Sequence, residues 1–284
     1  HLCQLEDSVM EIPASVDSVL GRNQRSFVMT QDLSRRELLA TAAGMATIAV
    51  AATALTPGLA AAEASPPPEP GAGALAKAYL GKHEPMSLPF DPAKLDGLSE
   101  KLVRSHWENN YQGAVKALNT IEPKLPGLVA DKDWPAYLLG DVKREEALRT
   151  GSMIMHQHYF ANLGGDGKIA GDIVAPLNEW FGSSAAWEAE FRKIALGLGG
   201  GSGWCVLSLN LYTGEMHNRW AWDHTAGVAW ECPLLVCDMY EHAYAMDYGA
   251  AAGKYIDAFM RNVKWEEVNR RLAVGRKLIA AMAG

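Results

Sequence analysis

The stretch Asp238-Met239-Tyr240-Glu241-His242-Ala243-Tyr244 decides how this chain is interpreted. It follows the apolar run Pro233–Cys237, which is typical of a buried strand. A carboxylate at the end of such a strand, with the imidazole of His242 four residues later, is costly to bury unless a metal ion or another partner satisfies both groups. The pair therefore points to a metal site, whereas any single histidine of the chain, taken alone, is expected to be a surface or core residue without function.

The sequence around this stretch predicts a mixed domain. A small antiparallel sheet is expected from two strand-like segments joined by a turn at 212–214, together with the run that ends at Asp238. Helices are expected on both sides of these strands. The expected helices cover 184–198, 249–262 and 265–282, and the expected strands cover 204–209, 215–222 and 233–237.

The preceding part of the chain is predicted to be helical. Apolar spacing favours a long helix over 96–121 with Asp96 as its cap, another helix starting at 133–135, and a third over 145–163. The glycine cluster at 164–167 then marks a domain boundary. We thus expect an α+β protein, with a helical domain at 88–165 and a mixed domain at 166–284.

Composition excludes several classes of protein. The 284 residues are 49% apolar, which is enough to bury a core. Lys and Arg number 26 against 33 Asp and Glu, and a net charge of −7 argues against nucleic acid as a partner. The 4 cysteines are too few and too irregularly spaced for a disulfide framework or a paired-CxxC zinc site.

The first 87 residues are interpreted as an extension, an export signal and a linker. Arg35-Arg36 followed by an alanine-rich run to Ala62 resembles a twin-arginine export signal over 29–64, which implies the twin-arginine translocation machinery as a partner and a periplasmic or extracellular protein. A retained membrane anchor is the alternative, and no permanent anchor is expected. Residues 1–28 are expected to be a gene-model extension, and 65–87 a proline-rich linker.

Several ordered motifs resemble the iron/manganese superoxide dismutases over residues 88–284. The family fingerprint D-x-W-E-H-A-Y appears here as D-M-Y-E-H-A-Y. The other matching motifs are Leu88-Pro89-Phe90, Ser105-His106-Trp107-Glu108-Asn109-Asn110-Tyr111, His156-Gln157-His158-Tyr159-Phe160, Gly201-Ser202-Gly203-Trp204 and Asn262-Val263-Lys264-Trp265.

This resemblance implies a fold and an activity. The fold is a long N-terminal α-hairpin domain followed by an α/β domain with a three-stranded antiparallel sheet. The activity is the conversion of superoxide to dioxygen and hydrogen peroxide at one iron or manganese ion per subunit, without an organic cofactor. His158 competes with His156 for one ligand position, and the family spacing favours His156. The implied metal ligands are His106, His156, Asp238 and His242.

The resemblance also implies roles for residues around the metal. Family members place a glutamine beside the metal-bound solvent, and Ser152 occupies one of its positions here. His224 is therefore expected to hydrogen-bond that solvent, and this expectation favours iron over manganese. Glu241 resembles an intersubunit contact and implies a homodimer. Tyr111 is assigned part of a proton relay. Residues expected to surround the ligands are Trp204, Tyr240 and Phe160.

One departure from the family pattern opens a second hypothesis. The family's gateway tyrosine is replaced by Ala114, so the chain is alternatively a metal-binding homologue with weak or altered activity. A non-haem iron oxygenase is less favoured because it usually uses two histidines and one carboxylate. A zinc hydrolase would not need the ordered motifs.

Overall fold

The computed structural model describes residues 75–283. The predicted extension at 1–28, the predicted export signal at 29–64 and the start of the linker lie outside the described residues. Within 75–283, no helix is both long and apolar enough to cross a membrane.

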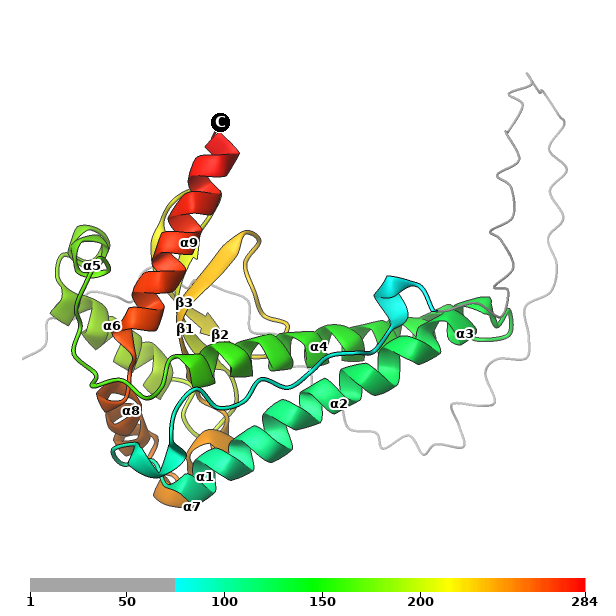
Figure 1. Cartoon of the computed structure of the whole chain (residues 1–284), viewed down its shortest axis with the longest axis horizontal. Helices are drawn as coiled ribbons and strands as arrows, with labels where there is room; N and C mark the ends of the chain where they lie inside the picture. The colour runs from blue at the N-terminus through cyan, green and yellow to red at the C-terminus, as the bar shows by residue number, and fades with distance from the viewer. Residues whose placement is uncertain (1–74, 284) are drawn as a thin grey trace, which may run out of the picture. The chain divides into compact units, whose positions relative to one another are not determined.

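Two long helical segments lie side by side (Figure 1). The first runs without a break through α1 (Glu100–Ser105), the π-helical segment η3 (His106–Tyr111) and α2 (Gln112–Ile121). The second is α4 (Ala136–Ala161), so the predicted start at 133–135 and the predicted helix over 145–163 belong to one helix. The expected α-hairpin is therefore present.

The first helix begins later than predicted. Ser99, not Asp96, is its N-cap, because the Ser99 hydroxyl accepts a hydrogen bond from the Leu102 backbone N–H at 3.1 Å. Gly97, with φ +81°, separates Asp96 from the helix. The Asp96 carboxylate instead accepts a hydrogen bond from Arg261 at 3.0 Å.

The three predicted strands form one antiparallel sheet in the order β2-β1-β3. They are β1 (Trp204–Asn210), β2 (Met216–Ala221) and β3 (Glu231–Asp238). Trp204 pairs with Ala221 on one side and with Asp238 on the other. This register brings the end of β3 and the loop after β2 to the same end of the sheet.

Helices pack against the sheet (Figure 1), and six of the seven residues of its central strand β1 are buried. α6 (Ser184–Leu196) packs against β1 and β2, whereas α4 and α9 (Trp265–Ala283) contact β3. α6 begins at Ser184, where the predicted helix begins, and its N-cap is Ser183, because the Ser183 hydroxyl accepts from the Ala186 N–H at 3.0 Å. The remaining elements are η1 (Lys77–Tyr79), η2 (Pro92–Lys94), η4 (Glu122–Lys124), α3 (Leu125–Ala130), α5 (Val174–Phe181), η5 (Glu241–Ala243), α7 (Ala245–Tyr248) and α8 (Ala252–Arg261).

Candidate metal centre

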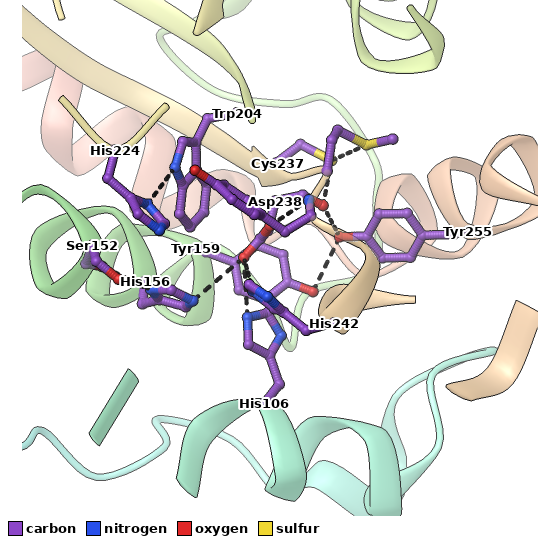
Figure 2. A network of polar contacts seen from close by, with 12 residues as sticks. His106, Ser152, His156, Tyr159, Trp204, His224, Cys237, Asp238, His242 and Tyr255 are labelled. Carbon is purple, nitrogen blue, oxygen red and sulfur yellow. Dashed lines mark hydrogen bonds and ion pairs between the residues drawn. The ribbon is translucent and has the colours of Figure 1, made fainter. Parts of the chain in front are cut away.

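Three imidazoles surround one carboxylate where the helical hairpin meets the sheet (Figure 2). They come from the start of η3, from α4 and from η5, and the carboxylate is the last residue of β3. Their ligand atoms all lie within 4.8 Å of one another. The distances from Asp238 Oδ2 to the imidazole Nε2 atoms are 3.0 Å for His106, 3.2 Å for His242 and 3.5 Å for His156.

The π-helical segment positions the first of these imidazoles. The Gln112 N–H donates to the carbonyl of Trp107, five residues earlier, and the Asn109 side chain donates to the Ser105 carbonyl at 3.0 Å. Such widened turns occur mostly as single interruptions of α-helices, frequently at functional sites. Here His106 opens the widened turn and is 2% exposed.

The second imidazole is held in one tautomer. His156 Nδ1 lies 2.7 Å from the Ser152 carbonyl, which only accepts, so Nδ1 carries the proton. Burial lowers the pKa of His156 to about 3, which keeps the ring neutral and leaves the lone pair on Nε2. That atom is buried and has no hydrogen-bond partner among the described residues. A buried acceptor without a donor is what a metal ion would satisfy.

His158 lies on the same helix but outside the group of four. Its backbone carbonyl accepts a hydrogen bond from Arg271 at 3.1 Å. Two residues along an α-helix face different directions, so only one of the two imidazoles can point at Asp238. The structure brings His156 to the group, as the family spacing favoured.

The central carboxylate is fully buried and ionised. Asp238 Oδ1 accepts from the Tyr240 N–H at 2.9 Å, and the Asp238 carbonyl accepts from the Tyr255 hydroxyl at 2.6 Å. Burial alone would raise the pKa of Asp238, but the charge of His242 and hydrogen bonds from His106 and His242 hold it well below its usual range. An anionic oxygen thus lies among the nitrogen donors.

This donor set fits a first-row transition metal. Ligand bonds of about 2 Å place neighbouring donor atoms roughly 3–4 Å apart, and the separations from the Asp238 oxygen lie in that range. Imidazole and carboxylate donors suit iron, manganese and zinc. The nearby Cys237 is a buried thiol whose pKa is raised well above its usual value by burial, so it adds no thiolate to the set.

His224 lies beside the group with a defined tautomer as well (Figure 2). The indole N–H of Trp204, which can only donate, contacts His224 Nδ1 at 3.0 Å. Burial lowers the pKa of His224, so the ring is neutral at pH 7 and its proton is on Nε2. Tyr240 stacks between two imidazoles, with ring centroids 4.6 Å from His224 and 5.3 Å from His242.

A cavity of about 410 Å³ reaches this group from outside. Its walls are formed by the imidazoles of His156, His224 and His242, by Tyr240, and by residues of both long helices. From the first helix the lining residues are Asn109, Asn110, Gly113 and Ala117, and from α4 they are Arg149 and Ser152.

Ala114, at the family's gateway position, does not line this cavity. It is 1% exposed and forms part of the hairpin interior. The neighbouring Gly113 lines the cavity instead, and no atom lies within 4 Å of the point where a Cβ would stand. The wall contributed by α2 is therefore made of small residues.

Tyr111, predicted to take part in a proton relay, is buried beside the site. Its ring is 1% exposed and its hydroxyl accepts from the Met86 N–H at 2.7 Å and from the Gln157 amide at 3.0 Å. Tyr111 does not line the cavity. The hydroxyl anchors the segment before the first helix, the ring lies 6.5 Å from that of His156, and the relay role stays a prediction.

Other predicted neighbours lie near the site. The Phe160 ring is 5.0 Å from the His106 ring, and the Trp204 ring is 5.1 Å from that of His156. Glu241 is exposed beside His242. Arg149, Gly151 and Tyr255 were missed by the sequence reasoning, although Arg149 and Ser152 share a helical face with His156 at spacings of seven and four residues.

Known proteins resemble this chain over most of its described part. Residues 169–271 match the family model for iron/manganese superoxide dismutases, C-terminal domain. The "Superoxide dismutase [Fe]" of Cupriavidus metallidurans is 47% identical over 191 residues, which cover 67% of this chain and 96% of the relative. The "Superoxide dismutase [Fe]" of Aquifex aeolicus is 30% identical (67% and 92%), and the "Superoxide dismutase [Mn]" of Mycolicibacterium fortuitum is 32% identical (66% and 90%).

Proposed function

The chain belongs to the iron/manganese superoxide dismutase family, and from this we propose that it converts superoxide to dioxygen and hydrogen peroxide at one metal ion per subunit. The observation that carries the proposal is the convergence of three imidazoles on one buried carboxylate at the end of an open cavity. The residues that would hold the ion are His106, His156, Asp238 and His242.

The ion would supply a one-electron redox couple, and the chain's own residues would supply the surroundings. The carboxylate of Asp238 would offset part of the ion's charge, and the neutral ring of His156 would offer its Nε2 lone pair. Trp204 would keep the proton of His224 on Nε2, so that His224 donates a hydrogen bond toward the reacting oxygen atoms. Peroxide formation needs protons, and a fixed donor at the cavity wall serves that need.

A paired measurement tests this function. The full chain is purified, its metal content is measured by mass spectrometry, and cyanide-insensitive superoxide dismutation is expressed per bound metal. The matched variant Asp238→Asn keeps the shape of the side chain and removes its charge, so we expect loss of metal and of activity together. Equal metal content in both proteins would refute the ligand assignment.

A second candidate is favoured by the cavity wall. α2 presents Gly113 and Ala117 to the cavity and no tyrosine hydroxyl. Without that hydroxyl, the second candidate is a metal-binding homologue with weak or altered activity. Full occupancy by iron or manganese with negligible turnover per metal would establish this candidate in place of the first.

We propose iron as the metal. The support is the 47% identity to a relative named as an iron enzyme. A relative of lower identity, that of Mycolicibacterium fortuitum at 32%, is named as a manganese enzyme and supports the opposite choice more weakly. Protein from cells supplied with both metals should contain mainly iron, and mainly manganese would overturn this choice.

We further propose a homodimer and an exported protein. Glu241 is exposed next to His242, so its carboxylate is free to contact a second copy, and sedimentation should give twice the chain mass. Export rests on the sequence pattern at Arg35-Arg36 alone. The double substitution Arg35→Lys with Arg36→Lys should retain the precursor in the cytoplasm, and normal export would refute the signal.

A further inference from the structure

We propose that Arg149 is the group that draws the anionic substrate into the cavity leading to the metal-binding residues. The inference rests on the proposed function and deepens it, because it names the side chain that recognises the charge of superoxide. Superoxide carries one negative charge, whereas the chain has a formal net charge of −7. Long-range repulsion from such a protein has to be overcome by local positive charge near the site.

Arg149 is placed for this task. It lies on α4, seven residues before His156 and three before Ser152, and all three line the same cavity. Among the described residues of that lining, Arg149 is the only Lys or Arg, and none is a carboxylate. An anion that enters the cavity therefore meets one permanent positive charge on its way to His156 and His242.

A neighbouring carboxylate holds the guanidinium in place. Glu145 Oε1 accepts from Arg149 Nε at 2.7 Å and lies 2.6 Å from one of its terminal nitrogens. Glu145 is one helical turn earlier and does not line the cavity. The pair thus presents its positive member to the cavity, and the fixed fork of arginine leaves other N–H groups for a small anion.

The field of Arg149 reaches the imidazole beside the metal site. Burial is the main cause that lowers the pKa of His224; the charges of Asp238 and Asp223 act in the opposite direction, and the charge of Arg149 adds a smaller lowering. Because both residues line one cavity, the same field acts on an anion between them.

Two readouts on the iron-loaded full chain test the proposal. The first is the dissociation constant of azide, a small anion, measured by optical titration. The second is the second-order rate constant for superoxide decay, measured at low and high ionic strength. At low ionic strength, Arg149→Gln should weaken azide binding and slow superoxide capture by about threefold to tenfold, and salt should shrink the difference. Arg149→Lys should keep most of both, because it keeps the charge.

The chain offers a matched control. Arg104 forms the same kind of pair with Glu100, with Nε 2.7 Å from Oε1 at a spacing of four residues, but does not line the cavity. Arg104→Gln changes the net charge equally and should leave both readouts within twofold. Equal effects of Arg104→Gln and Arg149→Gln would overturn the proposal, as would a failure of Arg149→Lys to retain azide affinity. If the wild type binds iron and azide but does not consume superoxide, the proposed function fails while the azide series still decides the role of Arg149.

Discussion

Gly151 is the point where α4 touches the loop that carries His224. A Cβ on Gly151 would stand 2.0 Å from the His224 carbonyl oxygen and 2.9 Å from its carbonyl carbon. These are backbone atoms, which cannot move aside as the end of a flexible side chain can. Gly151→Ala therefore tests whether this close approach sets the position of His224.

The size of the effect follows from the geometry. Ordinary contact begins at 3.4 Å, so the loop has to retreat by about 1.4 Å. Overpacking of this kind costs about 2–3 kcal/mol, whereas replacing a helical glycine by alanine gains only about 1 kcal/mol. A net loss of about 1–2 kcal/mol corresponds to a melting temperature lower by roughly 2–8 °C for a domain of this size.

The assay compares two glycines on the same helix by calorimetry of the metal-free protein. Gly140 has no atom within 4 Å of its hypothetical Cβ, so Gly140→Ala should raise the melting temperature through helix propensity alone. Metal content should stay unchanged in both variants, because neither substitution touches a ligand. If Gly151→Ala raises the melting temperature as Gly140→Ala does, the loop is not held by this contact and the reasoning fails.

Two further predictions concern stability. Arg271 is 5% exposed and donates hydrogen bonds to Glu267, to the Asn162 side chain and to the carbonyl of His158. Arg271→Met should therefore lower the free energy of unfolding, measured in urea, by about 3–5 kcal/mol. The control Arg270→Met, at an exposed position, should change it by less than about 0.5 kcal/mol. Burial, aided by the charge of Arg271, lowers the pKa of His158 to about 4, so the unfolded chain binds more protons than the folded one below pH 6.5. The free energy of unfolding of the metal-free protein should therefore fall as the pH drops from 6.5 toward 4, and it should fall less for His158→Gln. Equal dependence on pH in the two proteins would contradict the lowered pKa of His158.

The metal-binding group could be predicted from the sequence because its signals are local. Asp238 and His242 lie four residues apart at the end of an apolar run. A carboxylate and an imidazole in that arrangement indicate a metal site in any fold that buries the run as a strand. The distant members, His106 and His156, came from family motifs. No local pattern shows that segments 132 residues apart bring His106 to Asp238.

The helix boundaries were harder to predict for a physical reason. α4 was divided in two because its middle carries charge rather than apolar periodicity. That stretch is stabilised by ion pairs along the helix, between Lys143 and Glu146 and between Glu145 and Arg149. Pairs three and four residues apart support a helix without any apolar stripe, so hydrophobic spacing alone does not detect it.

The cavity wall could not be predicted because it depends on how two helices face each other. By family position, Ala114 should guard the entrance, yet the widened turn at His106–Tyr111 and the packing of α2 leave it buried and turn Gly113 and Ala117 to the cavity. With side chains this small, α2 offers no functional group that could select the substrate. Under the proposed function, recognition of the anion and supply of a proton would then depend on the other walls of the cavity, where Arg149 and His224 lie.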